Sequence, residues 1–396
     1  MKIYNKSVIG KVNPLPIPTL FIDGESITSW LLRASFNQGC DYSAILFYHW
    51  SEYKLSHADF DKGFNQIDPK IQNDLAVLMN SNKEFLDKQT LIHYNQKLGI
   101  EFQKNNKLKW IIPIGKFDSK KTNGYPYCFH CFREGEEHLK LKWRYSWFVY
   151  CNKHHLQLSD TCPHCDKPYQ PHLIKLPQHS LIQCPHCHKD LTDALTNLLV
   201  KDDAYKLQSL ASQVLDSGQG IIFGQSWESK DWFELILFYI NFIRKGLVSD
   251  ENSLYRRTLN RLLNDIRGVK LEKVKSGLAF DLLTIHERIM LMSYANQLLN
   301  VDLDEWMKVL IELGFTQSSL KFGKNPVIPK PFLLVHDQLP MSIKQPVNRE
   351  IGNHKMKPKS TKAVLLSWER LQLKIDKVKT HGEIRANRKL TARATA

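Results

Sequence analysis

Apolar residues recur at helical spacing near the start of the chain. Ile27, Trp30, Leu31 and Ala34 share one helical face, so we predict a helix that Ser26 opens and Gly39 ends. A second helix is predicted directly after this glycine. Two short helices joined at a glycine are typical of half of a helix-turn-helix unit. The second helix is predicted at residues 42–50, and further helices in this part of the chain at 71–79 and 86–98.

Helical periodicity returns in the second half of the chain. Pro326, Pro329, Pro331, Pro340 and Pro346 follow it and indicate a linker. The longest apolar stretch, residues 232–243, is shorter than the roughly 20 residues that a membrane span needs. We therefore expect no membrane partner. The helical periodicity predicts helices at residues 204–215, 231–245, 253–266, 280–299 and 303–313.

Between these regions, residues 139–150 alternate strongly and are rich in aromatic side chains, which predicts a β-strand. Lys140, Lys142 and Arg144 would then share one strand face, where they could contact phosphates. A solvated strand face is the alternative. The predicted fold class is mainly α with small β. The predicted parts are a helix-turn-helix-like domain at 1–115, two tandem zinc ribbons at 120–195, a helical domain at 196–322, and a linker with a basic tail at 323–396.

Cysteine spacing supplies the chemistry of the central part. Seven of the eight cysteines fall into Cys-x-x-Cys or Cys-x-x-His pairs about twenty residues apart. Two such pairs point four soft ligands at one tetrahedral ion, as zinc ribbons require. Two structural Zn²⁺ ions are therefore expected, with complete ligand sets at Cys128, Cys131, Cys151 and His154, and at Cys162, Cys165, Cys184 and Cys187.

Three alternatives bear on these cysteines. His155 could replace His154 as the fourth ligand of the first site, although Cys-x-x-His matches the spacing of the other pairs. A disulfide framework is the other use of paired cysteines, but a chain of 396 residues can build a core without such links. Cys40 stands apart and is most simply a buried helical thiol. Reduced thiols used as ligands indicate a cytosolic protein.

The formal net charge of +15 indicates a polyanionic partner. Twelve basic and three acidic residues lie between Lys355 and Ala396, so this tail carries more than half of the excess. Nucleic-acid contact is expected there, because neutralised phosphates release counterions, and a solvated tail is the alternative. The phosphate contacts named in the tail are Lys355, Lys357, Lys359, Lys362, Arg385, Arg388 and Lys389.

Two segments together resemble the TniQ family. Pro16-Ile17-Pro18, then Glu25-Ser26-Ile27-Thr28-Ser29-Trp30-Leu31-Leu32-Arg33-Ala34, is similar to the opening of that family. Cys128, Cys131, Trp143, Cys151 and His154 follow the spacing of its first ribbon. Phe129 and Asn152 stand where the family usually has proline, and neither is a ligand. The resemblance covers roughly residues 14–190.

The resemblance implies a non-catalytic target selector of a Tn-seven-like or CRISPR-associated transposon. Such proteins bind target DNA or a CRISPR RNA-guided surveillance complex, and they recruit an AAA+ ATPase that regulates transposition. Some act as dimers, so a homodimer is among the implied partners. The implied location is the bacterial cytoplasm. The alternatives are a stand-alone zinc-ribbon and helix-turn-helix transcription regulator, or an enzyme, for which the chain has no nucleotide-binding loop motif.

Overall fold

The structure is a computed structural model of the whole chain, which divides into two units, Met1–Ser342 and Ile343–Ala396. The described residues of the first unit are 12–53, 55, 59–62, 64, 68–98, 109–118, 121–193, 202–264, 266, 268–269, 278–322 and 327–341. In the second unit the described residues are helical and exposed: Thr361, Leu365, Trp368, Glu369 and Gln372. The seven phosphate contacts predicted in the tail lie outside the described residues.

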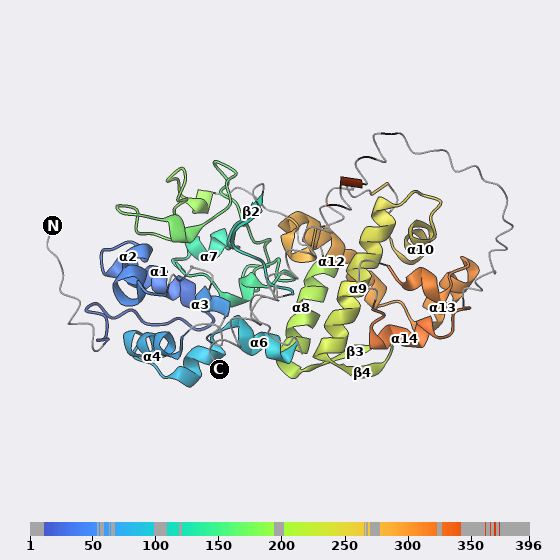
Figure 1. The fold of residues 1–396 in the computed structure, drawn as a ribbon, viewed down its shortest axis with the longest axis horizontal. Helices are drawn as coiled ribbons and strands as arrows, with labels where there is room; N and C mark the ends of the chain where they lie inside the picture. The colour runs from blue at the N-terminus through green and yellow to red at the C-terminus, as the bar shows by residue number, and fades with distance from the viewer. Residues whose placement is uncertain are drawn as a thin grey trace. The chain divides into compact units, whose positions relative to one another are not determined.

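Short helices form the N-terminal part, as the periodicity predicts (Figure 1). Ser26 caps the first of them, since its side chain accepts a hydrogen bond from the backbone N–H of Ser29. Gly39 follows with a φ of +68°, a left-handed conformation that suits glycine, and it joins two helices in contact with each other. The predicted helix at 86–98 is two helices, because Thr90 caps a new start. The bounds are α1 Ile27–Asn37, α2 Tyr42–Trp50, α3 Asp59–Lys62, α4 Pro69–Leu78, α5 Lys83–Lys88 and α6 Leu91–Lys97.

The central part consists of short elements and turns. The predicted strand at residues 139–150 is wrong: Leu141–Arg144 is a 3-10 helix, and its neighbours form isolated β-bridges. Residues 143–150 are all buried, so alternation along this segment does not separate a core face from a solvent face. The elements here are β1 Gly115–Asp118, β2 Lys121–Asn123, α7 Phe129–Arg133, η3 Leu141–Arg144, η4 Pro171–Leu173 and η5 Leu191–Asp193.

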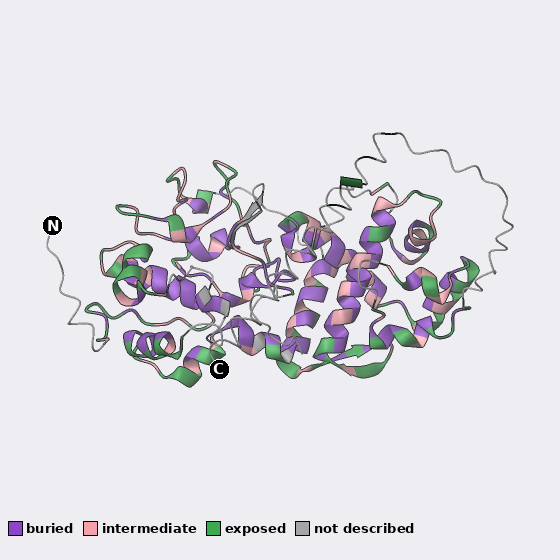
Figure 2. Cartoon of the chain, viewed as in Figure 1, coloured by how far each residue is buried: buried purple, intermediate pink, exposed green. Residues whose placement is uncertain are grey.

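The C-terminal part is built around three long helices that contact one another (Figures 1 and 2). A capping box between Thr284 and Glu287 starts the third of them and divides the predicted helix at 280–299 in two. A hairpin of antiparallel strands joins the first two. The bounds are α8 Asp202–Ser217, β3 Gln219–Ile222, β4 Gln225–Glu228, α9 Ser229–Val248, α10 Leu254–Leu262, η6 Phe280–Leu282, α12 Ile285–Leu299, α13 Leu303–Glu312, η7 Gln317–Leu320 and α14 Lys330–His336.

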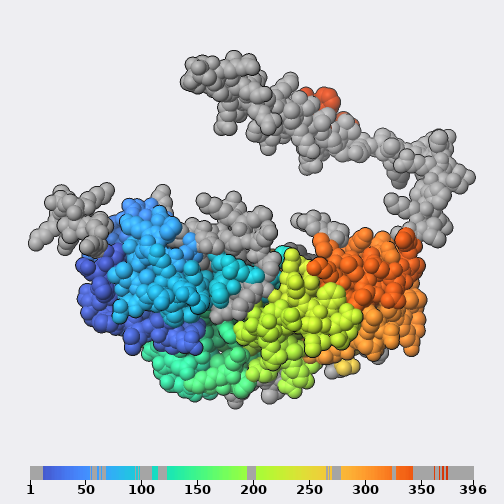
Figure 3. Space-filling model, turned by 90° about the horizontal axis from the view of Figure 1, so that it is seen from below, coloured from blue at the N-terminus to red at the C-terminus, as the bar shows by residue number. Residues whose placement is uncertain are grey.

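Two hydrophobic clusters fill the first unit, and both cross the predicted domain bounds. The smaller one gathers the N-terminal helices around Trp30 and also takes in Ile174 and Leu181 from the second cysteine-rich region, residues 162–187. The larger one runs from Leu91 to Leu339. It joins the first cysteine-rich region, residues 128–154, to the C-terminal helices without a break, and the two regions abut in the space-filling view (Figure 3).

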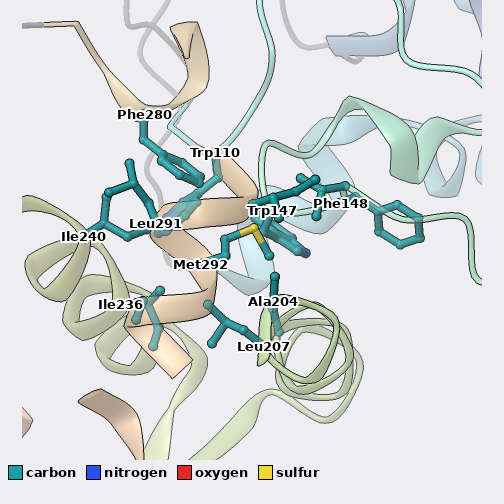
Figure 4. Packing of buried hydrophobic residues seen from close by; sticks show 14 of the residues in the cluster. Trp110, Trp147, Phe148, Ala204, Leu207, Ile236, Ile240, Phe280, Leu291 and Met292 are labelled. Carbon is teal, nitrogen blue, oxygen red and sulfur yellow. The ribbon is translucent and has the colours of Figure 1, made fainter. Parts of the chain in front are cut away.

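Aromatic packing makes that second junction. Trp110 and Trp147 contact each other at a centroid distance of 5.6 Å, and both rings contact Phe233 of α9. Phe280 also packs on Trp110 (Figure 4). The predicted fold class, mainly α with small β, is confirmed. Among the described helices there is none whose length and apolar character would suit a membrane crossing.

Candidate metal centres and the surfaces around them

The first candidate centre unites three sulfurs and one imidazole nitrogen. The ligand atoms of Cys128, Cys131, Cys151 and His154 all lie within 4.8 Å of one another. His154 Nδ1 is 3.4 Å from the sulfurs of Cys128 and Cys131, and 3.6 Å from that of Cys151. Ligands bonded to one tetrahedral zinc at about 2.3 Å would lie about 3.8 Å apart, so these separations suit a single ion.

His154 belongs to this group and His155 does not. His155 has a φ of +53°, and its ring packs against Tyr205 of α8 at a centroid distance of 5.3 Å. The remaining ring nitrogen of His154, Nε2, is 3.0 Å from Glu134 Oε1. A carboxylate in this position holds the proton on Nε2 and leaves Nδ1 free to bind a metal ion. Hydrogen bonds from Lys153 and His154 lower the pKa of Glu134 to about 2, so it is ionised at neutral pH.

The second candidate centre contains four sulfurs, those of Cys162, Cys165, Cys184 and Cys187. The sulfurs of Cys162 and Cys187 are 3.6 Å apart, and those of Cys165 and Cys184 are 3.8 Å apart. In each pair the turn directs a backbone N–H at a ligand sulfur: His164 donates to Cys162 and His186 to Cys184, both at 3.4 Å. These donors stabilise thiolates.

Each donor set is chemically suited to one soft divalent ion. Four ligands complete a tetrahedral shell and leave no position for a reacting water molecule. The eight ligand candidates named from the sequence are therefore the eight residues that the fold brings together in these two groups. The groups differ in burial, since two of the four cysteines in the second are partly exposed.

Of the three basic residues predicted to share one strand face, Arg144 is placed differently. Its side chain is buried, with Nη1 3.0 Å from Asp61 Oδ2 and Nη2 donating to the carbonyl of Ile112 at 3.2 Å. This corrects the predicted phosphate contact at Arg144, because its guanidinium has no access to solvent. Lys140 and Lys142 stay partly exposed. Their amines lie 3.5 Å from a carboxylate oxygen of Glu136 and 3.9 Å from one of Asp216, so each faces an acidic side chain at the surface.

The motif at the start of α1 connects this helix to the segment between the Cys128–Cys131 and Cys151–His154 pairs. Glu25 is fully buried, and its carboxylate accepts hydrogen bonds from the Ser29 hydroxyl at 2.7 Å and from Arg33 at 2.6 and 2.8 Å. The Ser29 hydroxyl in turn accepts the backbone N–H of Leu139 at 2.9 Å, and the N–H of Ser26 donates to the Leu139 carbonyl. Glu25, Ser29 and Arg33 of the motif thus attach α1 to the segment between the two ligand pairs.

The family model TniQ matches residues 16–158. This part of the chain is a TniQ region. The match begins at the proline pair before α1 and ends four residues after His154, so it contains both the α1 motif and the whole first candidate metal centre. The resemblance is thereby confirmed over these residues. No curated protein matches the chain.

Sequence reasoning missed two side chains next to the TniQ region's metal group. Glu134 follows the first ligand pair by three residues, where a lone acidic residue gives no sign of its contact with His154. Gln208 lies on α8, beyond the match, and contacts the backbone beside Cys151. No periodicity or spacing connects a glutamine to a segment more than fifty residues earlier.

Proposed function

We propose that this protein selects target sites for DNA transposition. In this role it binds target DNA, or a complex that RNA has guided to DNA, and it recruits an AAA+ ATPase that regulates the transposase. Its part is binding and bridging, and it catalyses no step. The observation that carries the proposal is the TniQ match over residues 16–158.

The structure supports a scaffold of this kind. The buried Glu25–Arg33 pair and the Ser29 hydroxyl hold α1 against Leu139, so buried hydrogen bonds connect the two motifs of the match. A selector must hold its binding surfaces in fixed relative positions, because it bridges partners that do not contact each other directly. Buried charge-assisted hydrogen bonds provide such rigidity.

The two metal-binding groups are proposed to hold structural Zn²⁺. Zinc prefers thiolate and imidazole ligands in tetrahedral sets, and both groups offer such a set without an open position. Small elements such as α7 and η3 have few backbone hydrogen bonds of their own. Metal binding would supply part of their folding free energy, as in other zinc-dependent regions.

Lys140 and Lys142, together with the seven basic residues named in the tail, are the proposed phosphate contacts. With a formal charge of +15, the nonspecific electrostatic contribution to binding a polyanion is attractive, since each neutralised phosphate releases a counterion. Such contacts carry no sequence information. Sequence specificity for the target site would have to come from base contacts or from an RNA-guided partner.

The experiment compares binding of the whole protein to a candidate attachment-site duplex and to a scrambled duplex, each at low and at moderate salt. Selective binding that survives moderate salt means that the protein reads the target DNA itself. Weak, unselective and salt-sensitive binding assigns the address to an RNA-guided complex. Co-purification with that complex and with the ATPase is then the deciding measurement, and failure to retain either partner and to select DNA would overturn the proposal.

A further inference from the structure

One buried glutamine of the C-terminal helices holds the backbone beside a ligand of the first metal group. Gln208, on α8, is only 1% exposed. Its amide oxygen accepts the backbone N–H groups of Val149 at 2.7 Å and Tyr150 at 2.9 Å. Its amide nitrogen donates to the Tyr150 carbonyl and to the Asn152 side chain, both at 2.9 Å. A glutamine amide has two acceptor and two donor positions, and here all four are used.

These four bonds flank Cys151 on both sides. Cys151 and His154 contribute two of the four ligand atoms in the first group. The turn between them is closed locally, since the N–H of His155 donates to the Cys151 carbonyl and the N–H of Cys151 to the Leu156 carbonyl. Backbone hydrogen bonds between Tyr127 and Ser159, at 2.8 and 2.9 Å, join the segment after the turn to the residue before Cys128. Gln208 holds the segment on either side of Cys151 from α8, outside the turn.

Two apolar neighbours of Gln208 on α8 are buried against the same segment of the chain. Ala204 and Leu207 of α8 are buried in the larger hydrophobic cluster, which also contains Cys128, Cys131 and Cys151. Tyr205, on the same helix, contacts the ring of Tyr150 at a centroid distance of 6.1 Å. The second metal group also reaches this cluster through Cys162 and Cys184, but the described contacts of Gln208 go to residues 149–152 only.

We infer that Gln208 is a positioning residue for the first metal site. It holds the Cys151–His154 turn at the separation from Cys128 and Cys131 that one ion requires, so the metal affinity of this site depends on α8. The affinity of the second site does not. The TniQ region, residues 16–158, thus contains every ligand of its metal site but not the side chain that sets two of them in place. The inference rests on the metal occupancy proposed above and is independent of target selection.

The test uses the full chain with Gln208→Met, which keeps the volume of the side chain and removes its four hydrogen bonds. Gln213→Met is the matched control, since Gln213 is an exposed glutamine on the same helix. Zinc affinity is measured by competition with a chromophoric chelator. Cadmium-113 resonances then assign each loss to the site with four sulfurs or to the site with three sulfurs and one nitrogen.

We expect Gln208→Met to weaken the first site about tenfold, the lower end of what partners around metal ligands contribute, with the second site unchanged. Gln213→Met should change neither. The inference would be overturned if both sites of Gln208→Met kept the zinc affinity of the wild type, or if both lost affinity by the same factor. If far-UV circular dichroism shows that Gln208→Met loses helix, Asn152→Ala decides, since it removes one of the four bonds at an exposed position. A weakened first site then supports the inference, and an unchanged one overturns it.

The wild-type metal content separates this inference from the proposal beneath it. Fewer than two bound ions in the wild-type chain contradicts the metal sites themselves. Two bound ions with a normal first site in Gln208→Met contradicts only the role of the glutamine.

Discussion

Arg144 and Asp61 form a buried ion pair, with Arg144 Nη1 3.0 Å from Asp61 Oδ2 and both side chains almost fully removed from solvent. The other carboxylate oxygen of Asp61 accepts the backbone N–H of Thr28 in α1 at 3.0 Å. The pair therefore connects α1, α3 and η3, which lie far apart in the sequence.

Arg144→Met should destabilise the protein by about 3–5 kcal/mol, because it leaves the Asp61 carboxylate buried without its partner. Lys142→Met, two residues away on the partly exposed face, should cost less than about 1 kcal/mol. Thermal or denaturant unfolding measures both. The double variant Arg144→Met/Asp61→Asn should recover much of the loss, because it removes the buried charge and keeps an acceptor for the Thr28 N–H. An Arg144→Met variant as stable as Lys142→Met would show that the pair is unimportant.

Cys128→Ser and Cys184→Ser should each remove one of two bound metal ions and lower the melting temperature, because metal binding contributes folding free energy. Cys40→Ser is the control, since this cysteine lies outside both groups. Elemental analysis of the purified variants gives the metal content. Two ions retained in either ligand variant would contradict the assignment of that cysteine.

Ser29→Ala should cost about 1–3 kcal/mol of stability, because it leaves the buried backbone N–H of Leu139 without an acceptor. It also removes one donor from the buried Glu25 carboxylate. Ser43→Ala, at an exposed position of α2, should change stability by less than about 0.5 kcal/mol. Equal unfolding midpoints for the two variants would refute the role of Ser29 in attaching α1.

Asp281 should make stability depend on pH. Burial raises the pKa of Asp281 to about 6, above its ordinary value of 3.8. The folded state therefore binds the proton more tightly than the unfolded state. The stabilisation from this proton is fully present below pH 3.8 and is lost as pH rises to about 6.

The measurable consequence is the difference in unfolding free energy between the wild type and Asp281→Asn, taken in excess zinc so that both metal sites stay filled. Relative to the variant, the wild type should lose about 1 kcal/mol between pH 5 and pH 7, most of it below pH 6.5. A difference that stays constant across this range would place the pKa of Asp281 near its ordinary value.

Removal of residues 355–396 should weaken DNA binding and flatten its salt dependence, since twelve of the removed residues are basic. For each phosphate that the shortened chain no longer neutralises, the slope of log K against log salt should become shallower by about 0.9. The double variant Lys140→Ala/Lys142→Ala gives a comparison on the first unit. An unaltered slope in the truncated chain would show that the tail makes no phosphate contact.

Much of the fold follows from the sequence because its signals are local. Residues such as Ile27, Trp30 and Leu31 repeat at helical spacing, and α1 forms where they predict it. The two metal groups follow from spacing alone, since a Cys-x-x-Cys turn sets its own ligand geometry.

The wrong predictions all concern contacts between distant segments. Alternation at residues 139–150 indicated a half-buried strand, but Arg144 and Ser146 are as buried as Trp143 and Tyr145. An arginine at such a position looks solvated until its partner is known. Asp61 lies 83 residues away, and Gln208 lies 58 residues from Tyr150, so neither contact leaves a mark in the local pattern.

The hydrophobic cluster that runs from Leu91 to Leu339 limits how this protein can have been assembled in evolution. A gene fragment ending near residue 158 would encode Trp110 and Trp147 without Phe233 and Phe280, the rings that cover them. Such a fragment would expose a broad aromatic surface and would tend to aggregate. The first cysteine-rich region and the helices that follow it therefore depend on each other for a covered aromatic core.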